Sequence, residues 1–262
     1  MRFDDFDKKM RIYEESIDQK ILPDIYIVAR LDGRSFTKLT KETMKYEAPF
    51  DINFCSLMIN ATKELMKNSG FRILYGYTQS DEISLLFAPD ENTFGRKVRK
   101  INTTLSGEAS ASMSLKLGLK ATMDCRVIPL PNIDRVGDYF VWRQEDATRN
   151  ALNSWCYWTL RKEGYSVGKA TSELKGKGIS FKNELLFQRG INFNNLPDWQ
   201  KRGVGIYREK IEKEGYNPIT KEKVMTTRKQ LFVDGHLFYG DDYRKFITMI
   251  IVNSDKSHVD KK

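Results

Sequence analysis

The order of apolar segments between residues 26 and 128 constrains the fold more than any other feature of this chain. Segments with the spacing of strands and helices follow one another in the order βαββαβ. The expected strands cover residues 26–31, 71–78, 83–87 and 121–128, and the expected helices cover residues 53–68 and 96–117. This order is typical of ferredoxin-like sheets, so we predict an α+β fold built on such a sheet.

Two aspartates stand at the ends of strands that this topology makes neighbours. Asp32 follows the first strand, and Asp81 lies 49 residues later in the loop between the second and third strands. Taken alone, each aspartate could simply form a turn at the end of a strand, as aspartates often do. Held together at one rim of a sheet, two carboxylates can bind a pair of Mg²⁺ ions, the usual device for moving a nucleotide onto an oxygen nucleophile. We therefore predict a nucleotidyltransferase with Asp32 and Asp81 as catalytic residues.

The residues beside these aspartates suit the same chemistry. Gly33 lets the backbone approach an ion or a phosphate closely, so its carbonyl is a candidate metal ligand. Arg30 and Arg34 flank it, and arginine is suited to bidentate phosphate contact. Glu82 points away from Asp81 if the strand alternation holds, which gives it a supporting role.

Composition limits the partners and the kinds of site. The 262 residues carry 44 Lys and Arg against 35 Asp and Glu, a net charge of +9. This balance is consistent with a polyanionic partner such as nucleic acid, and equally with a merely basic soluble protein. Two histidines and three separated cysteines argue against a zinc site or a disulfide framework. No apolar run approaches a membrane span and no signal peptide is evident, so we expect a cytoplasmic protein without a membrane partner.

The second expected helix begins with basic residues. Arg96, Lys97 and Lys100 would form a solvated face if they behaved as most such runs do. The helix follows the strand that adjoins the acidic loop, so the other possibility is contact with the triphosphate of a nucleotide bound at Asp32 and Asp81.

The second half of the chain is a mixture of helical and irregular patterns. We divide the chain into residues 1–135, the catalytic domain, and residues 136–262, a helical and mixed portion packed on it for RNA binding or oligomerisation. Residues 182–195 interleave amides, aromatics and cations, which suits RNA and equally a subunit interface. Residues 224–239 read as a hairpin that turns at Asp234-Gly235.

Five spaced motifs resemble those of the tRNA(His) guanylyltransferase family. They are Arg30-Leu31-Asp32-Gly33-Arg34-Ser35-Phe36, Tyr77-Thr78-Gln79-Ser80-Asp81-Glu82, Trp142-Arg143-Gln144-Glu145-Asp146, Lys182-Asn183-Glu184 and Ile191-Asn192-Phe193-Asn194. They occur in the family's order over residues 5–210. The resemblance implies addition of nucleotides to the 5′ end of tRNA in the 3′-to-5′ direction. It also implies a polymerase-palm fold, in agreement with the βαββαβ order.

The resemblance further implies a site. Asp32, the carbonyl of Gly33 and Asp81 would bind two Mg²⁺ ions, with Asp51 in a supporting role. The nucleotide would lie against Asp32, Gly33, Arg34, Ser35, Phe36, Thr37, Ser80 and Asp81. Polar side chains in and near the later motifs would contact the triphosphate or the RNA: Arg143, Arg149, Asn150, Lys182, Asn183, Asn192 and Asn194.

The implied substrates are ATP, GTP or other nucleoside triphosphates, and the 5′ end and acceptor stem of a tRNA. ATP would activate a 5′-monophosphate, and the 3′-hydroxyl of the incoming nucleotide would then expel AMP. A 5′-triphosphate end would release pyrophosphate instead. The resemblance also implies a homotetramer.

Two departures from the family pattern bear on the function. Members that add the extra G to tRNA(His) carry a His-Ile-Asn-Asn-Leu-Tyr-Asn-like stretch, which is Thr148-Arg149-Asn150-Ala151-Leu152-Asn153-Ser154 here. Ala48 replaces a usual lysine, so one phosphate contact is either missing or supplied by Lys45. The first departure favours template-dependent repair or editing of tRNA 5′ ends, with tRNA(His) guanylyltransferase proper as the alternative. A nucleotidyl cyclase and a non-catalytic RNA-binding module are more remote alternatives. The sequence leaves open which tRNA is used, and whether a eukaryotic protein would be mitochondrial.

Overall fold

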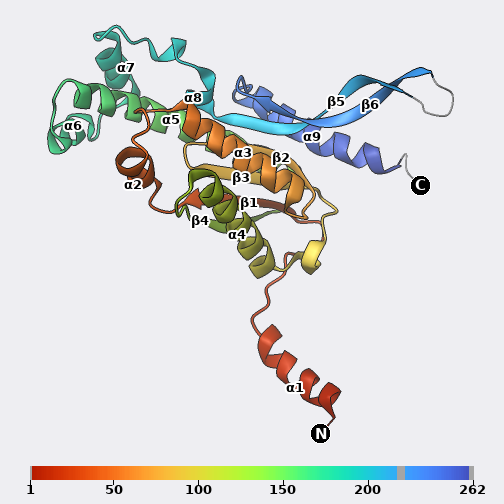
Figure 1. Ribbon diagram of the computed structural model, residues 1–262. Coiled ribbons are helices and arrows are strands. Elements are labelled where there is room, and N and C mark those ends of the chain that lie inside the picture. The colour runs from red at the N-terminus through yellow and green to blue at the C-terminus, as the bar shows by residue number, and fades with distance from the viewer. Residues whose placement is uncertain (1, 217–221, 260–262) are drawn as a thin grey trace.

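A computed structural model describes residues 2–216 and 222–259 of the protein, with side chains as far as residue 254. Its centre is a six-stranded antiparallel sheet in the order β4-β1-β3-β2-β5-β6 (Figure 1). The strands are β1 (Tyr26–Gly33), β2 (Ile73–Gln79), β3 (Glu82–Phe87), β4 (Met123–Leu130), β5 (Val204–Tyr216) and β6 (Lys223–Asp234). The first four form the predicted βαββαβ unit, which is confirmed. Strands β5 and β6 extend the same sheet, and the division of the chain after residue 135 stays a prediction.

Helices α3 (Ile52–Asn68) and α4 (Val98–Leu117) cover one face of the sheet. Asp51 begins α3 by accepting hydrogen bonds from the backbone N–H groups of Asn53 (2.7 Å) and Phe54 (3.2 Å), the usual role of an aspartate at an N-cap. Gly118 follows α4 in the left-handed conformation with φ of 66°. Both helices lie where the apolar spacing predicts them, because their buried positions recur at helical intervals.

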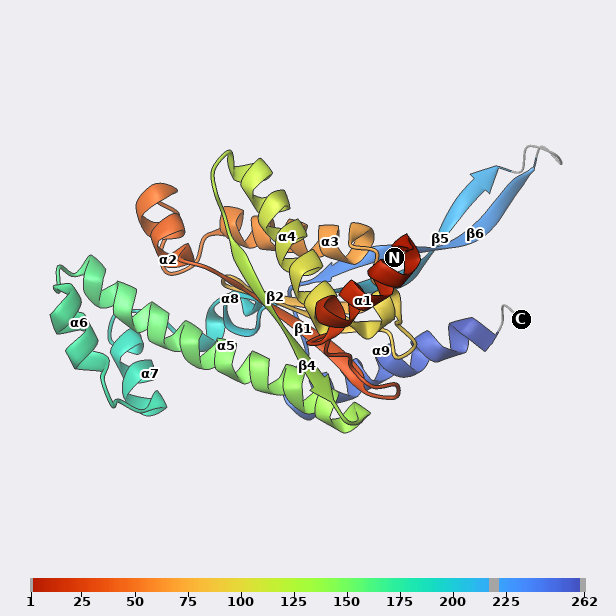
Figure 2. The ribbon, with the colours of Figure 1, turned by 90° about the horizontal axis from the view of Figure 1, so that it is seen from below.

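The long helix α5 (Ile133–Lys162) and the C-terminal helix α9 (Asp241–Val259) cover the other face. Aromatic side chains dominate this layer. Tyr75 of β2 and Tyr243 of α9 are fully buried, and their hydroxyl oxygens lie 2.9 Å apart. Figure 2 shows that α5 continues beyond the sheet, where it carries the remaining small helices.

These small helices are α6 (Val167–Leu174), α7 (Ile179–Phe187), η3 (Phe193–Asn195) and α8 (Asp198–Arg202). Several of them pack on the second half of α5 around Leu152, Cys156 and Leu186. A short insertion, α2 (Phe36–Lys38) with η1 (Leu39–Thr43), follows β1, and η2 (Thr93–Arg96) precedes α4. Helix α1 (Phe3–Glu15) has no buried residue and stands clear of the body (Figure 1). Within the described part of the chain, no helix is long and apolar enough to span a membrane.

The predicted hairpin over residues 224–239 is wrong. Strand β6 runs without a turn from Lys223 to Asp234 and pairs along its length with β5. Gly235 and His236 follow the end of that strand, and the backbone N–H of His236 donates to the side chain of Asp234 at 2.8 Å. Asp234-Gly235 therefore marks the end of β6 and not a turn between two strands, because β6 pairs with β5, which precedes it in the chain.

Candidate active site

The antiparallel pairing of β1 with β3 brings the two predicted carboxylates to one rim of the sheet. Asp32 is aligned with Glu82, and the backbone N–H of Gly33 donates to the carbonyl oxygen of Asp81 at 3.1 Å. Ser80 takes a positive φ of 53° in the tight connection between β2 and β3. Residues 49 apart in the sequence thus become neighbours, as the topology predicts.

The environment of Asp81 is unfavourable for an unpaired negative charge. Burial raises the pKa of the Asp81 carboxyl, and the charge of Asp32 raises it further. The Ser80 hydroxyl donates to the carboxylate at 3.1 Å and offsets only part of this. Among the described residues, no cationic side chain pairs with Asp32 or Asp81. Two like charges held this way favour a bound cation.

Divalent magnesium fits this donor set, because it prefers oxygen ligands and takes one or two carboxylates beside substrate phosphates and water. Asp32, Asp81 and the main chain at Gly33 would hold it. Within the described residues, no three Asp, Glu, His or Cys side chains form a metal-binding group, so the protein by itself supplies a partial set of ligands.

Gly33 is required by the loop that follows it. A Cβ atom at Gly33 would lie 2.4 Å from Cγ of Phe36, which is far inside van der Waals contact. The Phe36 ring is buried against β1 and meets the Phe54 ring edge-on with centroids 6.2 Å apart. Ser35 makes the turn with a positive φ of 62°. The shape of the loop therefore depends on close packing of the Phe36 ring against the end of β1.

A cavity of about 920 Å³ opens above the two aspartates. Of the predicted nucleotide-binding residues, Asp32, Phe36, Thr37, Ser80 and Asp81 line it. Gly33, Arg34 and Ser35 are not among its lining residues, and the side chains of Arg34 and Ser35 are exposed. Much of the lining is aromatic: Phe36, Tyr46, Phe50, Phe54, Tyr77, Tyr157, Trp158 and Trp199. A cavity lined by both aspartates and by many rings suits a nucleotide, with its phosphates near Asp32 and Asp81 and its base against the rings.

Lys41 is a lining residue that sequence reasoning missed. Its ammonium group lies over the Trp158 ring at 5.5 Å from the centroid and donates to the carbonyl oxygen of Glu47 at 3.2 Å. Burial lowers the pKa of Lys41, while the charge of Asp51 opposes that change. Lys45, the expected substitute for the lysine absent at Ala48, is exposed and does not line the cavity. No local signal distinguishes the two lysines, because the irregular insertion after β1 decides which one turns inward.

Arg143 and Arg30 hold Glu82 beside the aspartates. Arg143 donates to the two carboxylate oxygens of Glu82 at 2.8 and 2.7 Å and to Asp146 at 3.0 Å. Nε of Arg30 lies 4.0 Å from Glu82. The Arg143 guanidinium is also stacked 4.5 Å from the Trp142 ring centroid. Arg143 is therefore committed to protein contacts, and its predicted contact with triphosphate or RNA stays a prediction.

Two other predicted contacts surround Asp146. Arg149, which is largely exposed, pairs with one of its oxygens, and Nδ2 of Asn150 donates to the other at 3.2 Å. Asn150 lines the cavity and Arg149 does not. Asp51 also lines it, so the cap of α3 places that predicted supporting residue at the site.

The predicted triphosphate contacts at the start of α4 are wrong. Arg96 is buried, and its guanidinium donates to the carbonyl oxygens of Ile21 (3.2 Å), Glu91 (3.1 Å) and Ile25. Ile25 precedes β1 and Asp32 is the next-to-last residue of that strand, so the two lie about 23 Å apart at the rise of a strand. Lys97 pairs with Asp18 at 2.6 Å, and Lys100 lies over the Phe94 ring at 5.6 Å. The basic run therefore stands at the opposite end of the sheet from the aspartates.

The remaining predicted RNA contacts lie beyond the cavity. Lys182 and Asn183 belong to α7, and Asn192 uses its side chain to accept from the backbone N–H of Asn194 at 3.0 Å. None of the four, Asn194 included, lines the cavity. Their contact with RNA stays a prediction.

Comparison with known proteins gives the family. The family model described as tRNAHis guanylyltransferase matches residues 7–131, and the one described as Thg1 C terminal domain matches residues 134–234. A probable tRNA(His) guanylyltransferase of Drosophila melanogaster is 36% identical over 205 residues, which cover 74% of this chain and 71% of that protein. The tRNA(His) guanylyltransferase of Debaryomyces hansenii is 32% identical over 223 residues, covering 80% and 83%.

Solved structures agree. A bacterial tRNA(His) guanylyltransferase (Thg1)-like protein in complex with ATP superposes with a TM-score of 0.71 at 26% identity, covering 93% of this chain and 97% of that one. The Saccharomyces cerevisiae tRNA(His) guanylyltransferase, at 24% identity and a TM-score of 0.67 over 83% of this chain and 95% of that one, shares the fold. With both family models matched and relatives aligned along most of its length, this chain belongs to the tRNA(His) guanylyltransferase family and is a nucleotidyltransferase.

Proposed function

We propose that this protein adds G to the 5′ end of tRNA(His), at position −1, by Mg²⁺-dependent transfer in the 3′-to-5′ direction. The observation that carries the proposal is that Asp32 and Asp81 meet at one rim of the sheet and line a cavity rich in aromatic rings. Relatives bearing the name tRNA(His) guanylyltransferase support this choice of reaction. ATP and GTP are the proposed substrates beside the tRNA, since related bacterial proteins have been solved with each.

In the proposed reaction, Mg²⁺ supplies Lewis-acid stabilisation of phosphate charge. The chain's own residues bind and orient the substrates. Aromatic rings such as Tyr46 and Phe54 give the base an apolar surface. Lys41 offers a positive charge toward a phosphate. Arg143 fixes Glu82, and through it the connection that holds Asp81, so that the two carboxylates keep their spacing.

Template-dependent repair of tRNA 5′ ends is the second candidate, and one position favours it. Thr148 begins the stretch that departs from the family's histidine-containing motif. Its Oγ1 lies 3.0 Å from the carbonyl oxygens of both Gln144 and Lys201, so its hydroxyl is occupied by the protein. A side chain committed in this way offers little to a tRNA or a nucleotide.

One experiment separates the two candidates. Purified protein is given ATP and each nucleoside triphosphate in turn, with either tRNA(His) lacking G at −1 or a tRNA truncated at its 5′ end. Addition of G opposite A73 of tRNA(His) supports the first function. Addition limited to the nucleotide that complements the opposing base of the truncated tRNA supports repair. Products formed from a nucleoside triphosphate without tRNA would instead indicate a cyclase, and the absence of any product would contradict both functions.

We further propose a homotetramer acting in the cytoplasm. Helix α1 supports association, because it exposes Phe3, Ile12 and Tyr13 at 78%, 70% and 68% and stands apart from the rest of the chain (Figure 1). Light scattering coupled to gel filtration gives the mass, and a monomer would contradict the assembly. Fluorescence of a tagged full-length protein in its native cell tests the compartment.

A further inference from the structure

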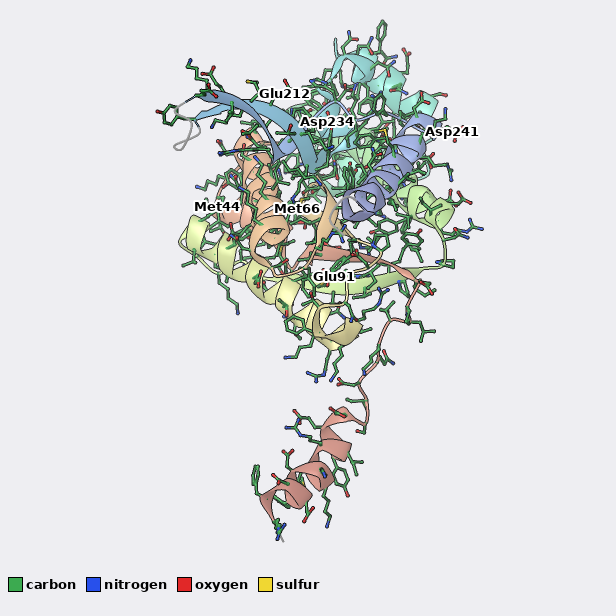
Figure 3. The ribbon with its side chains drawn as sticks, turned by 90° about the vertical axis from the view of Figure 1, so that its right-hand side faces the viewer. Met44, Met66, Glu91, Glu212, Asp234 and Asp241 are labelled. Carbon is green, nitrogen blue, oxygen red and sulfur yellow. The ribbon has the colours of Figure 1, made fainter. Side chains whose placement is uncertain are left out.

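A second hollow, of about 480 Å³, lies between α3 and the β5–β6 hairpin, away from the aspartates. We call it the basic groove. Figure 3 shows its two sides, with Met66 marking α3 and Glu212 marking the hairpin. Its charged lining residues are all cationic: Lys63, Lys67, Arg208, Lys213, Arg228 and Lys229. Glu212 is a carboxylate on the same hairpin, and it is not among the residues that line the groove.

One of these cations has a structural role. The guanidinium of Arg208 donates to the carbonyl oxygens of Ile73 at 2.6 Å and Met66 at 2.7 Å, which joins β5 to β2 and to the last turns of α3. The hairpin side of the basic groove is therefore held at a defined distance from α3, and Arg208 accounts for one of the six charges.

The other five cations have no comparable role. Within the described residues, Lys63, Lys67 and Lys213 form no ion pair with a carboxylate, and the same holds for Arg228 and Lys229. Like charges gathered in one hollow repel each other, and this cost is relieved when an anion binds. Several cations spread along a groove match a chain of phosphates better than a single small anion.

Helix α3 relates the basic groove to the catalytic cavity. Its beginning lines that cavity through Asp51, Phe54 and Met58, and its later residues Lys63 and Lys67 line the groove. At the rise of an α-helix, Lys63 and Lys67 lie about 18 and about 24 Å from Asp51. This span corresponds to roughly five to seven nucleotides at about 3.4 Å for each phosphate of a helical strand.

We propose that the basic groove binds the phosphate backbone of the RNA whose 5′ end reacts at Asp32 and Asp81. This inference rests on the proposed function for the identity of the RNA. The groove contacts phosphates and reads no base, so it positions a tRNA while pairing selects the nucleotide.

The test removes two positive charges from the groove and compares the effect on tRNA binding with that of removing two positive charges elsewhere. Lys63→Ala/Lys67→Ala changes the groove side of α3, where alanine is the best helix former. Lys8→Ala/Lys9→Ala is the matched control, because both lysines are exposed on α1 and the loss of charge is the same. Arg208 is left in place since it joins secondary-structure elements. Binding of fluorescently labelled tRNA is followed by anisotropy over a series of KCl concentrations, without nucleotide.

We expect the groove variant to bind tRNA roughly tenfold more weakly at low salt, with a plot of log affinity against log salt less steep by about 1.4–1.8, the contribution of two phosphate contacts. The control variant should have the tRNA affinity and salt slope of the wild type. Both variants should bind GTP as tightly as the wild type does. Wild-type tRNA affinity and salt slope in Lys63→Ala/Lys67→Ala would overturn the proposal. An equal loss of tRNA affinity in the control variant would also overturn it. So would a change in the mass of the assembly in Lys63→Ala/Lys67→Ala, because the groove would then be an interface between copies.

The same data separate this inference from the proposed function. If the wild type extends no tRNA but the groove variant still loses affinity for it, the proposed function fails and the basic groove stands. If the wild type extends tRNA and the groove variant binds it normally, the groove fails and the function stands.

Discussion

The guanidinium of Arg143 in α5 donates hydrogen bonds to both carboxylate oxygens of Glu82 at the start of β3, at 2.8 and 2.7 Å. Glu82 adjoins Asp81 in the chain and faces Asp32 across the sheet. The second half of the protein therefore fixes the catalytic rim formed by the first half. Both side chains of the pair are only 11% and 14% exposed, so the pair lies largely out of water.

Removing Arg143 should destabilise the protein and slow the reaction. Arg143→Met leaves Glu82 and Asp146 without their shared cation, and we expect a loss of about 3 kcal/mol in the free energy of unfolding. Urea denaturation measures this. In the double variant Arg143→Met/Glu82→Gln, much of the lost stability should be recovered, because Glu82 no longer carries an unpaired charge. Additive losses in the double variant would show that the pair does not couple.

Replacing either aspartate should abolish transfer without harming the fold. For Asp32→Asn and Asp81→Asn we expect roughly 10²–10³-fold lower kcat/KM, the cost of losing one group that stabilises developing charge. Thermal unfolding of Asp81→Asn should be unchanged or higher, because burial disfavours its charge. Asp124→Asn is the control. Asp124 is aligned with Asp32 on β4 but is exposed. Activity retained by Asp32→Asn or Asp81→Asn would refute the two-carboxylate site.

Adding a methyl group at Gly33 should damage the site. Gly33→Ala places Cβ on the Phe36 ring, and we expect a loss of about 1–3 kcal/mol in stability together with lower activity. Gly107→Ala is the matched control, since nothing lies within 4 Å of a Cβ there and the residue belongs to α4. That control should gain up to about 1 kcal/mol. Equal effects of the two substitutions, measured by calorimetry, would contradict the packing argument.

Lys41 should matter for substrate binding and Lys45 should not. For Lys41→Met we expect roughly tenfold weaker binding of a nucleoside triphosphate, as for the loss of one charged hydrogen bond. Lys45→Met should leave the affinity unchanged, since Lys45 is exposed outside the cavity. Isothermal titration with GTP and with ATP measures both. A larger effect at Lys45 would show that the family's missing lysine is replaced there.

Acid should weaken the contact between the segment after α1 and α4. Hydrogen bonds from Arg99 and from Lys97 hold the pKa of Asp18 well below its usual value of 3.8. A carboxyl with a lowered pKa stabilises the fold fully above the unfolded value and loses this contribution as pH falls toward the folded value. Asp18→Asn should therefore lower the unfolding temperature at neutral pH, and its difference from the wild type should shrink below about pH 4. A difference independent of pH would contradict the ion pairs.

The βαββαβ order and the meeting of Asp32 with Asp81 could be predicted from the sequence, because both follow from local spacing and from the one pairing that the order allows. Helices α3 and α4 were predictable for the same reason, since their apolar residues recur at helical intervals. The five spaced motifs are sufficient to indicate the family, because they are local stretches of sequence in a fixed order.

The roles of individual charged residues required the tertiary structure. Arg96 looks like a phosphate ligand in the chain, and only the fold places it among carbonyl oxygens about 23 Å from the site. Lys41 became part of the cavity and Lys45 did not because an irregular insertion decides which side chain turns inward. The basic groove arises where α3 lies beside strands that are more than a hundred residues later in the chain. Periodicity is a property of neighbours in sequence, whereas the partner of a charge depends on residues that only folding brings near.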